Sequence, residues 1–555
     1  MQRPSRPLGS RLAQVGVPAP AATAVPAPAH PVPAHPAPAH LAPFPRRPRG
    51  LRTGLVAFVL LFVAMGAWSV ATPLGGSPDE PAQLIRAASV VRGQLVGRPL
   101  PGATRAQGSI AVVRVPEVFA SLANDVSCFY VNPWAPAGCQ APLVPSPQDQ
   151  PVETYVGRYP PFYYAVVGLP TLVWVSPGGI YGARLASAAL SAAMLALAVV
   201  SLTRCRGRPM VVAGFSLAVT PMVLYLGGVV NPSGFELASA VAAFCGALAL
   251  ARLPLEEVGP AALAGFGAPA LALVLVRALA PVWALAALGM LVWLRPWAEV
   301  KVLVARAPTR AWLAVGALAG AFALAWDLLA GGLRLQPGEA VPAHAGAATV
   351  AHLALDRLHL IAVSSLGQFG WMDTPSPWGV VSTLALALGV LALLAFASGS
   401  RAARWLLVGT GVLWAGFCYV FVLAMVPTHG VVGQGRDFLG LAVGIPLVAG
   451  LGTRVARLPG FLQRRWRTLC GAFLAVVAIC QSADFYETLR RFSVGISGPV
   501  DAFAHVRHGW QPPVAGPVLV AAFIASVSLG AVLLWRLAGA VPPARPRPRS
   551  TWAVP

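Results

Sequence analysis

The chain has little charge for its length, and Lys301 is its only lysine. Charged residues make up 10% of the 555 residues and hydrophobic residues 57%, whereas a soluble domain carries roughly 25% charged residues. A soluble core could not enclose this much apolar surface, so lipid must cover part of it. The composition therefore excludes an ordinary soluble protein and favours a membrane protein.

Several functional signatures are also missing. The chain has no Walker A pattern, no G-x-G-x-x-G dinucleotide context, no H-E-x-x-H and no C-x-x-C pair, so ATP-driven transport and zinc-protease chemistry have no support. The formal net charge of +22 would suggest a nucleic-acid partner in a soluble protein. Here most arginines lie in short loops and tails beside apolar runs, as the positive-inside rule predicts, and we expect no nucleic-acid partner.

Apolar runs of bilayer-spanning length predict an all-α, polytopic transmembrane helix bundle of about 12 spans. We place the spans at 54–72, 180–202, 210–230, 235–252, 261–277, 280–295, 311–330, 378–398, 404–426, 438–453, 469–483 and 514–536. Residues 51–540 form the transmembrane domain, between a disordered Pro/Ala-rich tail (1–50) and a basic tail (541–555). The basic loops and tails predict a cell-membrane protein with both termini in the cytoplasm.

Two long polar segments, 73–160 and 331–377, then face outward, and the first is the longer. The apolar stretch 162–175 that follows it is short and begins near two prolines, so we expect a juxtamembrane or re-entrant helix; a full crossing would change the span count. Cys128 and Cys139 lie together in the first outer segment, where a disulfide is plausible in an oxidising compartment. The other five cysteines show no metal-ligand spacing.

The sharpest polar motif is S-P-D-E-P-A-Q, just after the first span. Its adjacent acids, Asp79 and Glu80, are the candidate catalytic residues, because carboxylates at a membrane surface can take a proton from an acceptor hydroxyl or hold a divalent cation. The ordinary structural explanation is a helix cap, since Pro81 can open a helix whose dipole stabilises acids. The motif alone leaves both explanations open.

Further polar motifs fall on the same predicted outer face. Their candidate substrate-binding residues are Arg158, Tyr159, Tyr163 and Tyr164 in G-R-Y-P-P-F-Y-Y, Asn231 and Glu236 in V-N-P-S-G-F-E, Trp371 and Asp373 in G-W-M-D-T-P, and Gln434, Arg436 and Asp437 in G-Q-G-R-D-F. Each motif alone is also explained by an aromatic belt, a capped turn or a salt-bridged helix end. Arg277, in a predicted outer turn, either snorkels or binds a phosphate. The convergence of these motifs on one face favours a functional site.

These motifs together resemble one family, the predicted bacterial membrane proteins grouped as domain of unknown function 2142. The resemblance rests on S-P-D-E-P-A, Y-P-P-F-Y-Y, N-P-S-G-F-E, G-W-M-D-T-P and Q-G-R-D-F, in this order, within residues 54–536. The chain departs from the family's common pattern at Gln83 and Asp437. That family in turn is similar to the GT-C superfamily of membrane glycosyltransferases, which take a sugar from a polyprenyl-phosphate carrier and carry acidic residues in the first outer loop, before a juxtamembrane helix.

The resemblance implies an inverting, lipid-linked-sugar-dependent glycosyltransferase of GT-C type in cell-envelope glycan synthesis. Asp79 would act as the general base, Glu80 would orient it or help hold a divalent metal ion, and Arg277 and Arg436 would bind the lipid phosphate. Tyr163, Tyr164 and Trp371 would stack on sugars. The implied partners are membrane lipid, a polyprenyl-phosphate-linked sugar donor, and a glycan, lipid or protein acceptor. A transporter or flippase of lipid-linked precursors and a non-catalytic membrane scaffold are the alternatives.

Overall fold

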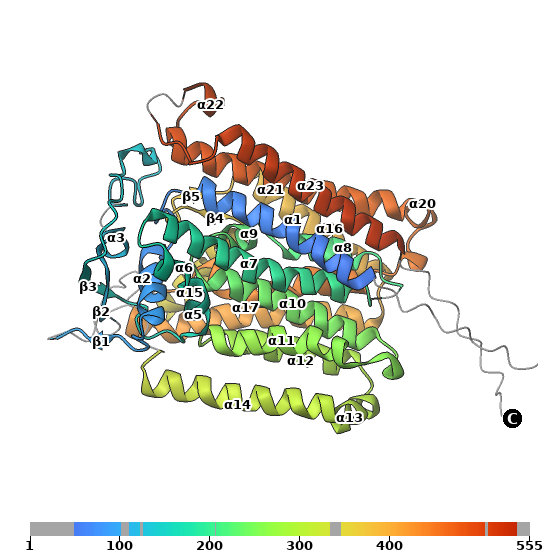
Figure 1. The fold of residues 1–555 in the computed structure, drawn as a ribbon. Helices are drawn as coiled ribbons and strands as arrows, with labels where there is room; N and C mark the ends of the chain where they lie inside the picture. The colour runs from blue at the N-terminus through green and yellow to red at the C-terminus, as the bar shows by residue number, and fades with distance from the viewer. Residues whose placement is uncertain are drawn as a thin grey trace, which may run out of the picture. The chain divides into compact units, whose positions relative to one another are not determined.

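The fold is described from a computed structural model. It describes residues 49–101, 110–122, 126–205, 207–332, 346–505 and 509–540, which belong to one compact unit that begins at Pro48. The predicted tails 1–50 and 541–555 lie outside the described residues, apart from residues 49 and 50. Within the described part the chain forms a bundle of long helices with a small sheet at one end (Figure 1).

In the described residues, nine helical stretches are long and apolar enough to cross a membrane. They are α1 (Arg49–Ala71), α7 (Pro177–Leu202), α10 (Pro232–Arg252), α14 (Ala307–Leu329), α16 (Trp378–Ser398), α17 (Arg401–His429), α18 (Gly435–Ala442) with α19 (Gly444–Gly452), α21 (Trp466–Val494) and α23 (Gly516–Ala540). Two of them, α7 and α10, start at a proline, whose missing N–H and fixed φ suit the first helical turn. The prediction of an all-α, polytopic transmembrane bundle is confirmed.

The three remaining predicted spans are shorter or broken. The helices α11 (Pro260–Val276) and α12 (Ala280–Leu294) are apolar but have 17 and 15 residues. The predicted single span 210–230 consists of α8 (Val211–Ala218) and α9 (Pro221–Gly227). Proline cannot donate the backbone hydrogen bond that would continue a helix, so Pro221 starts a new one. Each of the twelve predicted spans thus corresponds to one long, short or broken apolar segment.

The centre of the bundle is α10, which contacts α7, α11 and α12 and is almost entirely buried. By contrast, α14 lies along the edge of the bundle (Figure 1) and its apolar side chains are mostly exposed. Exposed apolar side chains on a helix of this length are expected where lipid replaces protein as the neighbour.

The first outer segment folds at one end of the bundle. It contains α2 (Glu80–Val91), α3 (Glu117–Ala120), the 3-10 turn η2 (Ala137–Cys139) and a three-stranded antiparallel sheet in the order β1 (Arg98–Pro99), β2 (Ala111–Pro116), β3 (Asp149–Thr154). In the β2–β3 register, Ala111 faces Thr154 and Pro116 faces Asp149. A disulfide joins Cys128 to Cys139. The sequence did not predict this sheet.

The stretch 162–175 forms two short helices, α5 (Phe162–Val167) and α6 (Pro170–Val173). Six and four residues are each too few to cross a membrane, so two short helices stand where the sequence predicted one juxtamembrane or re-entrant helix. The other elements are η3 (Leu255–Glu257), α13 (Trp297–Ala305), α15 (Ala347–Leu366), β4 (Gln368–Phe369), β5 (Thr374–Pro375), η4 (Val455–Arg457), α20 (Gly460–Arg464) and α22 (Ala502–His505).

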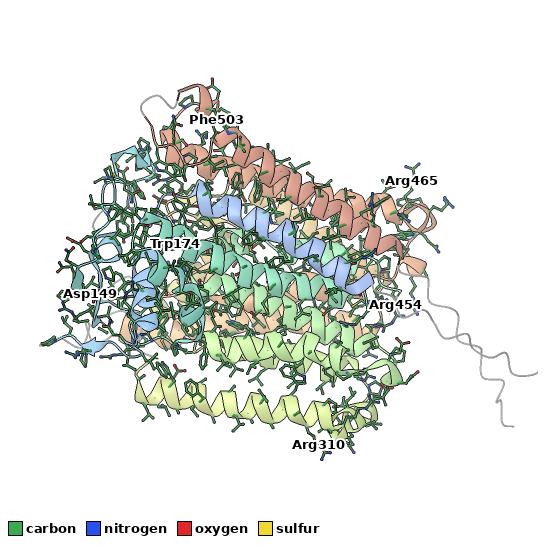
Figure 2. The ribbon with its side chains drawn as sticks, viewed as in Figure 1. Asp149, Trp174, Arg310, Arg454, Arg465 and Phe503 are labelled. Carbon is green, nitrogen blue, oxygen red and sulfur yellow. A yellow bond between two sulfur atoms is a disulfide. The ribbon has the colours of Figure 1, made fainter. Side chains whose placement is uncertain are left out.

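The two ends of the helical bundle differ in charge. Arg310, Arg454 and Arg465 are labelled at one end in Figure 2, and Asp149 and Trp174 at the opposite end, which carries the sheet. The arginine-rich end is the one that the positive-inside rule assigns to the cytoplasm. That orientation of the chain stays a prediction.

Candidate functional site

The turn between α1 and α2 presents Asp79 in an unusual backbone conformation. Asp79 precedes the first residue of α2 and has φ 63° and ψ −2°, and its side chain makes no cap hydrogen bond. Aspartate tolerates the left-handed region better than most residues, but such a conformation persists only where the surroundings impose it. Because the carboxylate does not cap α2, the helix-cap explanation of the motif fails for Asp79.

The adjacent acid, Glu80, holds this turn in place. Its carboxylate accepts from Nε and Nη2 of Arg184 at 2.7 and 2.6 Å, and both side chains are fully buried. Arg184 also donates to the backbone carbonyls of Ser69, Thr72 and Pro73 at the end of α1. Arg184 thus uses all five of its N–H donors to bind α7 to the α1–α2 turn.

This arrangement bears on the expectation that Glu80 helps hold a divalent metal ion. Both Glu80 oxygens face Arg184, and Oε1 also accepts from the Val230 N–H at 3.1 Å. The Asp79 carboxylate is engaged by an arginine as well. In the part of the chain that the structure describes, no group of three or more His, Cys, Asp or Glu side chains is arranged so that it could hold a metal ion. The residues present therefore do not fit the divalent metal ion that the sequence suggested.

Asp79 itself lies between an arginine and a tyrosine. Its Oδ2 accepts from Nη2 of Arg436, and its Oδ1 accepts from the Tyr155 hydroxyl at 2.5 Å. Burial acts to raise the pKa of Asp79, but the Arg436 charge and the Tyr155 hydrogen bond outweigh it, so the pKa lies below the ordinary value. The side chain is 27% exposed. Asp79 is therefore an ionised carboxylate that solvent can still reach.

Arg436 is positioned by the glycine that precedes it. A Cβ at Gly435 would lie 2.2 Å from the Ser365 nitrogen, so only glycine lets the start of α18 approach α15 this closely. The Gly435 N–H donates to the Ser364 hydroxyl at 3.0 Å. The Arg436 side chain is 9% exposed, and its Nε and Nη1 have no hydrogen-bond partner within the described residues.

A second arginine lies in the same cluster. Arg277, which follows α11, donates to Glu236 at 3.1 Å and lies 3.6 Å from Asp437. It also donates to the Ser233 hydroxyl, and Glu236 accepts from the Trp283 indole N–H. Asp437 accepts from the Gln434 N–H. Since Arg436 and Asp437 are neighbours in the chain, these contacts join five acids and arginines: Asp79, Glu236, Arg277, Arg436 and Asp437. We call this group, with Tyr155, the Asp79 cluster.

Tyr159 lies close enough to the Asp79 cluster for the charges of the cluster to change its pKa. Burial and the charges of Asp79 and Asp437 raise the pKa of the Tyr159 hydroxyl, against the opposing charge of Arg277. Its backbone carbonyl accepts from Arg86 at 2.6 Å. Arg158 is buried, and its carbonyl accepts from the Trp326 indole. This motif therefore borders the cluster through Tyr159.

The structure corrects the predicted roles of three other residues. Tyr163 and Tyr164 are buried, and their hydroxyls bond Ser187 at 2.9 Å and Gln83 at 2.5 Å. Neither ring has a free face for a sugar, so these tyrosines belong to the core. Asn231 caps α10 by accepting from the Ser233 N–H, and its amide donates to the Pro78 carbonyl. Asn231 is buried and stabilises the Asp79 turn.

The G-W-M-D-T-P motif belongs to a different cluster. Asp373 forms a buried ion pair with Arg491 at 2.5 Å, and Arg491 also donates to the carbonyls of Phe129, Asn132 and Ala135. Trp371 donates from its indole to the Gly75 carbonyl at 3.0 Å. These contacts attach the disulfide-bonded loop to α21. Asp373, a candidate substrate-binding residue on the same predicted face, therefore lies outside the group formed by Asp79, Arg277 and Arg436.

Sequence reasoning missed three residues that shape the site. Arg184 carried a signal, because it is the lone charged residue of a long apolar helix and such residues are rarely unpaired. Trp283 and Tyr155 carried no such signal in the sequence. Tyr155 reaches Asp79 because β3 ends beside the turn, and that strand belongs to a sheet that was not predicted.

Comparisons with known proteins give one family and one solved structure. No curated protein matches the chain. A crystal structure described as ArnT from Cupriavidus metallidurans bound to undecaprenyl phosphate matches 88% of this chain and 77% of its own, with a TM-score of 0.36 and 13% identity. That similarity is too low to support an argument. The model of the family described as "Predicted membrane protein (DUF2142)" matches residues 61–445, a range that contains all five motifs. The chain belongs to this family of membrane proteins of unknown function.

Proposed function

We propose that the protein is an inverting glycosyltransferase that uses a lipid-linked sugar at the outer face of the cytoplasmic membrane. The donor would be a polyprenyl-phosphate-linked sugar, and the acceptor a glycan, lipid or protein hydroxyl of the cell envelope. The base would be Asp79, and the phosphate would bind at Arg436 with help from Arg277. Glu80 supports the turn and takes no part in the chemistry.

The observation that carries this proposal is the unpaired donor pair of Arg436. Buried N–H groups without partners are uncommon in folded proteins, and Arg436 has two, Nε and Nη1, in a side chain that also contacts Asp79. Arginine N–H groups are strong donors to phosphate, and Nε and Nη1 lie on different edges of the guanidinium, so each can donate separately to a phosphate oxygen. An anion site directly beside an ionised carboxylate is what transfer from a phosphate leaving group requires.

The reaction would proceed in one displacement. The acceptor hydroxyl loses its proton to Asp79 as its oxygen attacks the anomeric carbon of the sugar. The bond between the anomeric carbon and the phosphate oxygen breaks, and the polyprenyl phosphate leaves with the bonding electrons. Arg436 stabilises the negative charge that develops on the phosphate. Attack from the face opposite the leaving phosphate inverts the configuration of the anomeric carbon.

The distribution of charge in the spans supports an enzyme over a transporter. Proton-coupled transport uses ionisable side chains inside the membrane. Asp, Glu, Lys and Arg are sparse inside the spans: α16 and α19 contain none, and the buried Arg184 of α7 and Asp484 of α21 bond Glu80 and Ser376. The Asp79 cluster instead forms where helices begin or end. A scaffold would need its acids fully engaged in salt bridges, as Glu80 is, whereas Asp79 keeps 27% of its side chain exposed.

The test compares Asp79→Asn with the matched variant Asp149→Asn. Asp149 is an exposed acid of the same outer segment. The purified full-length protein is incubated with polyprenyl-phosphate-linked sugars and envelope fractions, and release of polyprenyl phosphate is measured. Asp79→Asn should lower the rate by about 10²–10⁴-fold, the usual contribution of a general base, while Asp149→Asn keeps it. Full activity of folded Asp79→Asn would rule out the base assignment.

A further inference from the structure

The two longest C-terminal helices, α21 and α23, enclose an apolar groove whose lining includes no residue of the Asp79 cluster. A cavity of about 780 Å³ lies between them, lined by small or apolar side chains that include Gly471, Ala475, Ile479, Ser528 and Trp535. Two packed helices normally interdigitate and leave no such space. Small residues on both helices keep the groove open.

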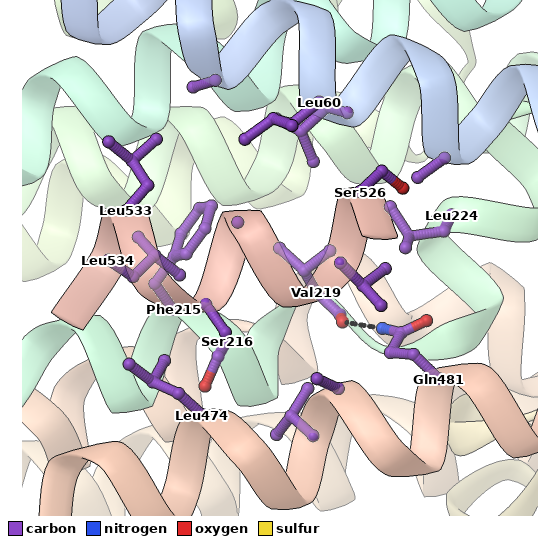
Figure 3. A pocket seen from close by; sticks show the side chains of 18 of the residues that line it. Leu60, Phe215, Ser216, Val219, Leu224, Leu474, Gln481, Ser526, Leu533 and Leu534 are labelled. Atoms are coloured by element: carbon purple, nitrogen blue, oxygen red, sulfur yellow. Dashed lines mark hydrogen bonds between the residues drawn. The ribbon is translucent and has the colours of Figure 1, made fainter. Parts of the chain in front are cut away.

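A second, smaller cavity lies on the inner side of the same helix pair. It has a volume of about 100 Å³, and Leu60 of α1, Phe215 of α8 and Gln481 of α21 point towards it (Figure 3). The two cavities share Leu474, Ala478 and Ala531 as lining residues. The groove therefore has an apolar floor that reaches into the bundle.

The groove has the depth of one membrane leaflet. Its lining runs along α21 from Gly471 to Ala483, and twelve residues at about 1.5 Å per residue span about 18 Å. Half of a hydrocarbon core of about 30 Å is about 15 Å. A single acyl chain that enters from the membrane surface would thus fit along the groove.

An arginine is held at one mouth of the groove. The Arg467 guanidinium lies 4.5 Å from the centre of the Trp535 ring, and the Trp535 indole donates to the Arg467 carbonyl at 3.2 Å. Arg467 has no carboxylate partner in the described part of the chain. Arg464, Arg465 and Arg536 are exposed nearby in sequence, and residues 438–483 contain no acid. The mouth of the groove therefore carries positive charge that no nearby carboxylate neutralises.

We propose that the α21–α23 groove is a binding site for one anionic phospholipid of the leaflet at the arginine-rich end. An acyl chain lies along the groove beside Ala475 and Ile479, and the phosphate meets Arg467 above Trp535. Ile479 is 68% exposed, so the chain would cover apolar surface that the protein leaves open. Basic sites next to grooves between transmembrane helices suit anionic headgroups because the phosphate charge and the apolar chain are satisfied together. This proposal does not depend on the sugar-transfer hypothesis.

The experiment measures which lipid the full-length protein retains. The protein is reconstituted in bilayers that contain equal amounts of phosphatidylcholine and phosphatidylglycerol. It is then released from the bilayer, and native mass spectrometry measures the ratio of the two lipids that stay bound to it. Arg467→Gln removes the headgroup contact and Ala475→Leu fills the groove from an exposed position. Arg467→Gln should lower the preference for phosphatidylglycerol about fivefold, since one arginine near the surface contributes ~1 kcal/mol and a factor of ten corresponds to ~1.4 kcal/mol. Ala475→Leu excludes the acyl chain, so it should lower the amount of phosphatidylglycerol that the protein retains.

Matched control variants distinguish lipid binding in this groove from a general effect of surface charge. Arg310→Gln removes an exposed arginine at the same end of the bundle, and Ala472→Leu enlarges an exposed α21 residue that does not line the groove. Both should keep the preference of the unmodified chain. Equal losses in Arg310→Gln and Arg467→Gln would overturn the proposal, and so would a protein without any preference. The protein could instead form a dimer that retains no lipid and that Ala475→Leu separates into monomers. This result would show that a second copy of the chain occupies the groove, and it would also overturn the proposal.

Discussion

Replacing Glu80 with glutamine removes the negative charge from a carboxylate that is fully buried against Arg184. Arg184 would keep its three backbone carbonyl partners but lose both charge-assisted bonds to Glu80. Breaking a buried pair by removing one partner costs about 3–5 kcal/mol, because the other charge stays buried without compensation. Glutamine can still accept one of the bonds, so we expect about 3 kcal/mol of destabilisation.

The assay is reversible unfolding of the full-length protein in mixed micelles, followed by tryptophan fluorescence. Glu80→Gln, Arg184→Met and the double variant form a double-mutant cycle. The double variant should lose less stability than the two single variants together, since it leaves no unpaired charge. Glu153→Gln, an exposed acid of the same outer segment, should change stability by less than about 0.5 kcal/mol. Additive effects, or a neutral Glu80→Gln, would refute the assignment of Glu80 as a structural residue.

Two further predictions concern the outer segment. Because the pKa of Asp79 is lowered in the folded protein, its ionised form stabilises the fold above the ordinary pKa of about 3.9; this contribution is lost as pH falls through the lower native pKa. The difference in unfolding free energy between the unmodified chain and Asp79→Asn should stay constant from about pH 5 upwards and shrink below about pH 4; a difference that grows on acidification contradicts the prediction. The Cys128–Cys139 disulfide closes a sequence separation of 11 residues, so Cys128→Ser/Cys139→Ser should cost about 3 kcal/mol and make residues 126–140 more sensitive to limited proteolysis. Unchanged stability and digestion would contradict it.

The spans could be predicted because their signal is local. A run of apolar residues long enough for the bilayer needs no information from the rest of the chain, and every predicted span corresponds to an observed segment. The break between α8 and α9 has a local cause as well, the proline at 221, but a hydropathy average over 210–230 hides it. The small sheet β1–β3 was missed because its strands are short and pair only through contacts across the outer segment.

The candidate site was predicted in part. Asp79, Arg277 and Arg436 do meet, because the helices that carry them begin or end at the same side of the bundle. Asp373 was grouped with them because it lies on the same predicted outer face, yet an ion pair with Arg491 holds it in another cluster. The face on which a residue lies follows from the order of the spans, whereas its neighbour on that face depends on how the helices are arranged around the bundle axis.

By itself the sequence determined that this is a multi-pass helical membrane protein with polar motifs gathered at one end, since hydropathy and motif order are properties of the chain alone. Only the tertiary structure decided between the two adjacent acids of S-P-D-E-P. Glu80 turns inward to Arg184, 104 residues away in sequence, and Asp79 turns towards Arg436, 357 residues away. No local pattern distinguishes neighbouring carboxylates, because their roles depend on which distant arginine the fold brings to each.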